Sequence, residues 1–213
     1  MPWGRPSFFV VCHAFLSPAS SHWFPDRSII FVTWRLAGSA PPLTPATLTA
    51  ENTGRIPFCV RDQQLDRCSS GPFWLRDARI AKIVQDAIEY GATVRHSYDL
   101  YAWAIMPNHV HAVWEPHIPM PAIMRWLKGR TSRIANRVLG LSGEAFWQDE
   151  SYDHWIRSPR ELEEIISYVE GNPVNAGLVS AEEQWAWSSA RFRAVRQTTK
   201  NDGLPHGLLY GNL

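Results

Sequence analysis

Two β-strand patterns separated by Pro107-Asn108 constrain the fold of this chain more than any other feature. Residues 99–105, DLYAWAI, and residues 109–115, HVHAVWE, are rich in aromatic and apolar side chains, and the second segment alternates polar with apolar positions. Proline and asparagine are turn residues, and so short a connection joins antiparallel neighbours. The sequence therefore predicts a β-hairpin, and with it an antiparallel sheet.

Further secondary structure is predicted on both sides of the hairpin. Residues 28–36, SIIFVTWRL, are dense in β-branched and aromatic residues and are expected to form a strand. Apolar residues recur at helical spacing over 79–90, and Gly91 is placed to end that helix. A second helix is predicted over 121–138, before Gly140, with a core-facing stripe of Ile123, Trp126, Leu127, Ile134 and Val138.

The C-terminal half adds one strand and one helix. The strand is expected over 146–156. Ser158 as N-cap and Pro159 at the first helical position open the helix, whose apolar stripe is Leu162, Ile165, Ile166 and Val169. The order strand, helix, two strands, helix, strand, helix indicates an α+β fold, a small antiparallel sheet covered by helices.

The length and composition are those of one globular domain. With 213 residues, 45% hydrophobic and 19% charged, the chain has enough apolar side chains for a sizeable core, which excludes wholesale disorder. Residues 1–26 are rich in proline, serine and aromatics without periodicity, so we expect an irregular leader. The catalytic domain is expected over 27–196, and 197–213 would be a C-terminal tail.

Cysteine usage and hydropathy point to the cytoplasm. Cys12, Cys59 and Cys68 are odd in number and form no C-x-x-C pair, so neither a disulfide framework nor a cysteine zinc site is indicated. No stretch approaches the roughly 20 apolar residues of a membrane span. We therefore expect no membrane partner.

Positive charge is concentrated in one predicted helix. The net charge is only +1, yet residues 120–139 carry no acid and five bases, Arg125, Lys128, Arg130, Arg133 and Arg137. Such a face suits the phosphates of a nucleic acid. Helical arginines are more often simply solvated, and most of the eleven tryptophans are expected to pack in the core rather than stack on bases.

His109 and His111 are candidate metal ligands. Side chains two apart on a strand point to the same face, so both imidazoles can reach one ion while Val110 faces the core. The H-x-H pattern is short, and two polar residues on a solvent-facing strand would give the same pattern.

Tyr168 is the candidate nucleophile. On the predicted helix it lies at the flank of the apolar stripe, and Asn172 projects beside it one turn later. The following residue, Pro173, is expected to end the helix there. A phenol has a pKa near 10, so it would need a metal that polarises the phosphate. The alternative is an amphipathic edge residue whose ring packs on the core.

Three longer segments carry a family resemblance. They are YAWAIMPNHVHAVWEP at 101–116, FWQDESYDHWIR at 146–157 and YVEGNPVNAGLV at 168–179. Together with FVTWRLAG at 31–38, GPFWLRDARIA at 71–81 and WAWSSARF at 185–192, they resemble the REP-associated tyrosine transposases of the HUH single-strand transposase superfamily. The resemblance covers roughly residues 28–192.

The resemblance implies a ferredoxin-like core and a specific chemistry. His109 and His111 would bind Mg²⁺ or Mn²⁺, with Asn172 as a third ligand, and Tyr168 would attack single-stranded DNA to leave a 5′-phosphotyrosine and a free 3′-OH. The implied substrate is hairpin-forming, repeat-associated DNA in the bacterial nucleoid, bound by a monomer or homodimer.

Two other functions remain open from the sequence. One is a catalytically silent protein of the same fold that binds DNA or RNA hairpins. The other is a metal hydrolase that activates water and keeps Tyr168 as scaffold. His154, in YDHW, can assist at the site or simply pack.

Overall fold

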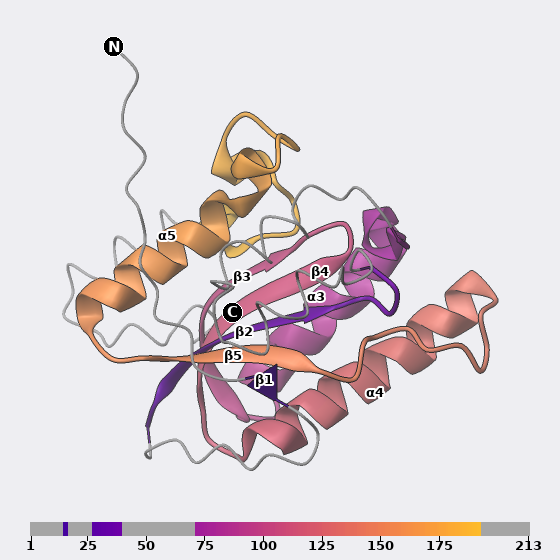
Figure 1. Cartoon of the computed structure of the whole chain (residues 1–213), viewed down its shortest axis with the longest axis horizontal. Coiled ribbons are helices and arrows are strands. Elements are labelled where there is room, and N and C mark those ends of the chain that lie inside the picture. Colours follow the sequence, from indigo (N-terminus) through magenta and orange to yellow (C-terminus); the bar gives the residue numbers. More distant parts are fainter. Residues whose placement is uncertain (1–14, 17–26, 40–70, 193–213) are drawn as a thin grey trace, which may run out of the picture.

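The computed structural model describes residues 15–16, 27–39 and 71–192 (Figure 1). Most of the expected leader, all of the expected tail and all three cysteines lie outside these residues. The strands are β1 Phe15–Leu16, β2 Ile29–Arg35, β3 Tyr98–Ile105, β4 His109–Pro116 and β5 Ser151–Ile156. The α-helices are α3 Ala78–Thr93, α4 Met120–Leu139 and α5 Pro159–Asn175, and the 3-10 helices are η1 Trp74–Arg76, η2 Glu182–Gln184 and η3 Ser189–Phe192.

The strands form one antiparallel sheet in the order β1-β5-β2-β4-β3. Within it, the chain order β2-α3-β3-β4-α4-β5 and the strand order β5-β2-β4-β3 are those of a ferredoxin-like core. The short β1 extends the sheet beside β5, and α5 follows the core as an addition. The α+β fold predicted from the element order is therefore observed.

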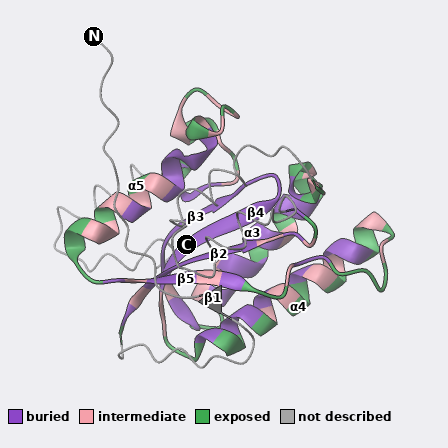
Figure 2. Ribbon diagram, in the orientation of Figure 1, coloured by how far each residue is buried: buried purple, intermediate pink, exposed green. Residues whose placement is uncertain are grey.

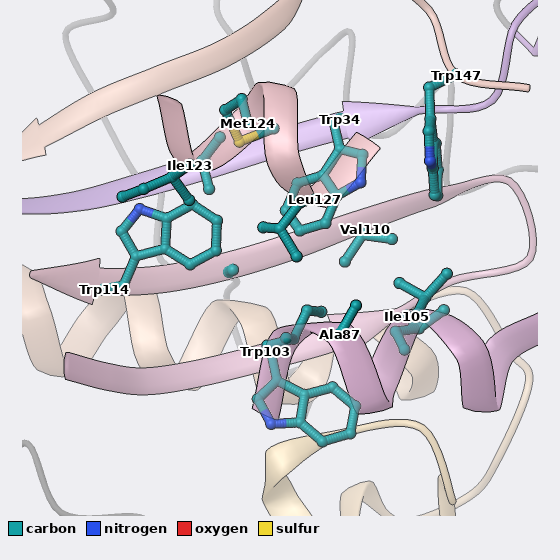
Figure 3. Close-up of a cluster of buried hydrophobic side chains, with 14 of the residues drawn as sticks. Trp34, Ala87, Trp103, Ile105, Val110, Trp114, Ile123, Met124, Leu127 and Trp147 are labelled. Atoms are coloured by element: carbon teal, nitrogen blue, oxygen red, sulfur yellow. The ribbon is translucent and has the colours of Figure 1, made fainter. Parts of the chain in front are cut away.

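The two faces of the sheet carry different helices. On one face Val110, Ala112 and Trp114 of β4 join a core filled from α3 and α4, including Ala87, Ile123 and Leu127 (Figure 3). On the other face Val113 packs with Phe31 of β2 and with Ile165 and Val169 of α5. Most residues of β2, β3, β4 and β5 are buried between these layers (Figure 2). Because β4 is covered on both sides, its polar residues are buried as well.

Local signals at the helix ends agree with the structure. The Asp77 side chain accepts a hydrogen bond from the Arg79 amide at the start of α3, and Ser158 Oγ accepts one from the Glu161 amide at the start of α5. Gly140 ends α4 in the left-handed conformation, with φ 70°. None of the described helices is long and apolar enough to cross a membrane.

The prediction that Gly91 ends a helix is wrong. Helix α3 continues to Thr93, and Gly91 is buried inside it against the ring of Tyr98. A Cβ atom at Gly91 would overlap the Tyr98 hydroxyl, which donates a 2.8 Å hydrogen bond to the Ile88 carbonyl. The glycine is needed for close packing between α3 and β3, not for a turn.

Replacing Gly91 by alanine should therefore destabilise the protein by roughly 1–3 kcal/mol, the usual cost of overpacking. Gly129 is the matched control, because it also lies inside a helix but has open space where a Cβ would be placed. Gly129→Ala should stabilise by about 0.5–1 kcal/mol through helix propensity. Urea denaturation of the two variants measures both effects, and equal effects would contradict the packing role of Gly91.

Two other features differ from the predictions, one strand boundary and the buried face of α4. The strand expected over 146–156 is regular only from Ser151, although Trp147 forms an isolated bridge with Leu36. On α4, Ile134 is half-buried and Val138 is exposed, whereas Thr131 and Asn136 are buried. Hydrogen bonds explain why the two polar side chains are buried. Thr131 Oγ1 accepts a hydrogen bond from Trp147, and Asn136 Nδ2 donates one to the Glu144 carbonyl.

Candidate metal and nucleophile site

His109 and His111 meet in the interior of the molecule. Both side chains come from β4, point toward α5 and are fully buried, with 0% exposed. Their rings lie edge to face at 74°, and the two Nε2 atoms are 2.9 Å apart. The alternation predicted for 109–111 thus places both imidazoles on one face, as expected, but this face is covered rather than exposed to solvent.

Each imidazole is held by a polar partner on its other nitrogen. His109 Nδ1 lies 2.7 Å from Oδ1 of Asn108, the preceding residue in the chain. His111 Nδ1 lies 2.7 Å from Oγ1 of Thr33, which is paired with His111 across the β2–β4 ladder. Neither Thr33 nor Asn108 was singled out from the sequence, where one is part of a strand and the other part of a turn.

Asn172 completes a group of three around the His111 Nε2 atom. Its side chain comes from α5, is fully buried, and places Nδ2 2.9 Å from His111 Nε2. The expectation that Pro173 ends the helix at this point is wrong, because α5 runs through Pro173 to Asn175. Since residues 169–173 of α5 are all buried, packing fixes the position of Asn172.

Tyr168 lies one turn before Asn172 and beside the histidines. Its ring packs on His111, with 5.9 Å between centroids, and edge to face on Phe31 at 6.2 Å. Its hydroxyl oxygen is buried, and among the described residues it has no hydrogen-bond partner. A buried hydroxyl without a partner is costly, and such groups often mark the place where a substrate is bound.

The group has the properties of a divalent-cation site. Burial, with His109 as a second cause, lowers the pKa of His111 well below 6.5, so this imidazole is neutral at physiological pH and has a lone pair to offer. Ligands about 2.1 Å from an octahedral ion are about 3.0 Å from one another, close to the 2.9 Å between the Nε2 atoms. An amide ligates through oxygen, and a half-turn of the Asn172 carboxamide exchanges its nitrogen for that oxygen.

The site differs from a carboxylate-rich metal centre. Among the described residues no three His, Cys, Asp or Glu side chains gather within reach of one ion. Two imidazoles and one amide carry no negative charge, so they favour a loosely held ion that completes its coordination with water and phosphate oxygens. The residues therefore fit Mg²⁺ or Mn²⁺ brought together with a polyanionic substrate.

The predicted DNA-binding arginines lie on α4, on the opposite side of the sheet from His109 and His111. Arg125, Arg130, Arg133 and Arg137 are all exposed on α4, which covers the face of the sheet opposite the histidines. Arg130 also stacks over the Tyr90 ring at 5.5 Å, and Arg95 stacks over Trp126 at 4.6 Å. No carboxylate in the described part of the chain pairs with these four α4 arginines.

Lys128 has a different place from the four arginines. Its ammonium donates hydrogen bonds to the carbonyls of Gln148, Asp149 and Glu150 and to Ser151 Oγ, at 2.9 to 3.2 Å. Burial lowers its pKa to about 8. Because these acceptors occupy its donors, Lys128 anchors the segment that leads into β5 and is not among the proposed phosphate contacts.

His154 is buried and is held by a carboxylate. Its Nε2 lies 2.8 Å from Glu161 Oε1, and Glu161 Oε2 accepts a hydrogen bond from the Arg157 amide. This contact ties β5 to the first turn of α5. Since the Nε2 atom of His154 is directed at Glu161 and not at the histidine pair, the packing role considered for it from the sequence is favoured.

Comparisons with known proteins find similarity to transposases. Residues 75–172 match the family of IS200-like transposases. The REP-associated tyrosine transposase of Escherichia coli (strain K12) is 26% identical over 93 residues, which are 43% of this chain and 54% of that protein. The chain thus matches about half the length of this curated relative.

A solved structure supports the fold. The structure of a REP-associated tyrosine transposase bound to a REP hairpin superposes with a TM-score of 0.57 at 17% identity, covering 90% of each chain. The α+β fold is confirmed by this superposition. The resemblance inferred from the sequence motifs is confirmed by the three comparisons together.

Proposed function

We propose that the chain cleaves and rejoins single-stranded, hairpin-forming DNA through a covalent tyrosyl intermediate, in keeping with the match of residues 75–172 to the IS200-like transposases. The observation that carries the proposal is the convergence of His109, His111, Asn172 and Tyr168 from β4 and α5. Residues 61 positions apart in the chain meet there within hydrogen-bonding distance.

In the proposed reaction Tyr168 supplies the nucleophile. Its phenolic oxygen attacks the phosphorus of a phosphodiester, a bond forms between Tyr168 Oη and phosphorus, and the bond to the 3′-oxygen breaks. The phenolic proton leaves to solvent, and the 3′-oxygen leaves with a proton as a free hydroxyl. The energy of the broken bond is kept in the tyrosyl phosphodiester, so the 3′-hydroxyl of another strand can reverse the step without a nucleotide cofactor.

The surrounding side chains orient the reacting groups. The rings of Phe31 and His111, which stack on each other, both pack against the Tyr168 ring and limit its motion. His109, His111 and Asn172 would hold Mg²⁺ or Mn²⁺, which polarises the phosphate and offsets its charge when bound. The neighbouring aliphatic residues of α5 exclude water from the inner side of the ring.

We further propose that the exposed arginines of α4 contact phosphates of the same DNA away from the cleavage point. The REP-associated tyrosine transposase that shares this fold is bound to a REP hairpin in its own structure. Since α4 and the Tyr168 site lie on opposite faces of the sheet, one phosphate cannot reach both. The substrate would need a folded or extended part beyond the cut, and a hairpin next to a single-stranded flank has this shape.

The test is incubation of the purified chain with labelled, hairpin-bearing single-stranded DNA in Mn²⁺ or in EDTA. The expected result is an SDS-resistant protein–DNA adduct and a product with a free 3′-OH, both only with Mn²⁺. Binding without cleavage across a broad panel of hairpins would instead favour the silent hairpin-binding protein.

The same hairpins test the arginine surface. Arg130→Ala together with Arg133→Ala should weaken binding and lower the slope of log affinity against log salt by about one for each phosphate that the variant no longer neutralises. Lys82→Ala is the matched control. Lys82 is also exposed and lies on α3, which covers the same face of the sheet as α4, but it is paired with Asp86. An unchanged salt slope in the double variant would exclude these arginines as phosphate contacts.

A further inference from the structure

Two aromatic rings and two arginines form a chain of contacts where the end of α3 meets α4. Tyr90 comes from α3, Trp126 and Arg130 come from α4, and Arg95 lies just after α3. The Trp126 and Tyr90 rings stack with 6.2 Å between centroids and 27° between planes. Arg95 Cζ lies 4.6 Å from the centroid of Trp126, and Arg130 Cζ lies 5.5 Å from that of Tyr90. Each ring therefore holds one guanidinium.

These guanidiniums are at the surface. Tyr90 is 42% exposed, and Arg95 and Arg130 are exposed, whereas Trp126 is half-buried and packs against the core. In the described part of the chain, no carboxylate pairs with either arginine. A contact with a ring uses no hydrogen-bond acceptor, so each guanidinium keeps N–H donors for another group.

The positions of both arginines are also set by the backbone. The Arg95 amide donates a 3.0 Å hydrogen bond to the Tyr90 carbonyl at the end of α3. Arg130 follows Trp126 by four residues on α4, so the two side chains project side by side. An arginine on a helix surface loses rotamer freedom when it binds a phosphate. The ring contacts restrict Arg95 and Arg130 beforehand and so reduce this cost.

A row of arginines continues from the rings along α4. Trp126, Arg130, Arg133 and Arg137 are spaced by four, three and four residues, so at about 100° per residue they fall within about 60° of one another around the helix. No acidic residue occurs in α4. These four residues and the neighbouring Tyr90 and Arg95 are called the basic stack surface below. Its charge complements a phosphate backbone.

Restricted donors favour a rigid partner. A paired DNA stem is stiff, with a persistence length of about 50 nm, so its phosphates keep fixed spacings and need no further ordering when they meet the donors. An unpaired strand would have to be ordered at the same time and would gain less. The basic stack surface also lies on the face of the sheet opposite Tyr168, which leaves the cleavage site to an unpaired flank.

We propose that the basic stack surface binds the paired stem of the hairpin, with Arg95 and Arg130 as phosphate contacts and with Trp126 and Tyr90 as positioning residues that hold them. The inference rests on the proposed function, because it takes the hairpin DNA of that function as the ligand. It adds Arg95, which lies outside α4, and two uncharged rings. Contacts to the backbone do not depend on the base sequence of the stem.

Fluorescence anisotropy of the full chain with a labelled hairpin, in EDTA, tests the surface without cleavage. A hairpin with an arbitrary stem sequence is a suitable probe, because backbone contacts are independent of sequence. Arg95→Ala should weaken binding by about 5–10-fold and lower the slope of log affinity against log salt by about one. Arg191→Ala should leave both unchanged. It is the matched control, because Arg191 is also exposed and contacts a ring, that of Phe192 at 5.1 Å, but lies outside α3 and α4.

Tyr90→Leu separates positioning from charge. It removes a ring but no charge, so it should weaken hairpin binding by about 3–10-fold with the salt slope of the wild type. In the Arg130→Ala background the same change should cost less than about twofold, because the guanidinium that the ring holds is already absent. Binding of an unpaired oligonucleotide of equal length should also fall by less than about twofold. Urea denaturation checks that each variant is folded.

Three results would overturn the proposal. Wild-type hairpin affinity of Tyr90→Leu would show that the rings serve only to pack α3 against α4. An unchanged salt slope in Arg95→Ala would exclude Arg95 as a phosphate contact. Equal losses for the hairpin and the unpaired oligonucleotide would refute the preference for a stem. In each case an adduct formed by the wild type with Mn²⁺ would leave the proposed function standing, whereas a wild type that binds no hairpin would refute both.

Discussion

Replacing Tyr168 by phenylalanine should abolish the covalent protein–DNA adduct and reduce hairpin cleavage by at least about 10³-fold, as expected when a nucleophile is removed. The ring contacts with Phe31 and His111 would be kept. Because the Tyr168 hydroxyl is buried and has no hydrogen-bond partner among the described residues, its removal should also raise the free energy of unfolding by about 1 kcal/mol. Denaturing gels and urea denaturation measure the two effects.

Tyr152→Phe is the control for this experiment. Tyr152 comes from β5 and packs edge to face on the same Phe31 ring at 6.2 Å, so the variant removes a second hydroxyl from the same neighbourhood. It should leave the adduct intact. Cleavage by Tyr168→Phe at the wild-type rate, with metal still required, would show that water is the nucleophile and that the chain is a metal hydrolase.

A variant that is inactive yet more stable would have a clear physical meaning. Functional sites often contain groups that destabilise the folded chain. Under the proposed function the Tyr168 hydroxyl has this character, since it would gain its partner only when a phosphate binds. Loss of activity together with loss of stability would instead point to a hydroxyl that supports the fold.

The parts of the fold that sequence predicts best are those fixed by neighbouring residues. The Ser158 cap, the Gly140 terminus and the Pro107-Asn108 hairpin each depend on a few consecutive residues, and all three are observed. The shared face of His109 and His111 follows from strand alternation for the same reason. Sequence rules for caps, turns and strand alternation suffice there, because each of these features is determined by residues close together in the chain.

The predictions that failed were overridden by contacts between distant segments. Gly91 is required by Tyr98, whose ring reaches the helix surface from β3, and the tendency of glycine to end helices has no effect there. Pro173 stays inside α5, where residues 169–173 are all buried against the rest of the domain. The spacing of apolar residues within α3 or α5 does not reveal which distant segments pack against Gly91 and Pro173.

The assembly of the site is non-local for the same reason. Thr33 meets His111 across 78 residues, through a strand register that neither segment specifies alone. Asn172 meets His111 across 61 residues, and only the family resemblance suggested that they belong together. Likewise the charge of α4 is visible in the sequence, whereas its location opposite the histidines depends on how the chain crosses the sheet.

The second large effect concerns the metal. His109→Gln combined with His111→Gln should lower Mn²⁺ affinity by at least about 100-fold and suppress adduct formation to a similar extent as Tyr168→Phe. Glutamine roughly keeps the volume of these fully buried side chains but removes both imidazole lone pairs. In the wild-type chain, Mn²⁺ at about 100 times its dissociation constant should raise the free energy of unfolding by about 2.7 kcal/mol, and this increase should vanish in the double variant.

His154→Gln separates loss of a ligand from loss of a buried histidine. His154 is also buried, but it contacts Glu161 rather than the Nε2 pair, so this variant should keep the stabilisation by Mn²⁺. If the double variant still gained stability from Mn²⁺, the ion would bind elsewhere. If it lost that gain but still formed the adduct, the tyrosine chemistry would not need this metal. Orientation by Phe31 alone would then have to activate Tyr168, and a phenol is a poor nucleophile at neutral pH without such a metal.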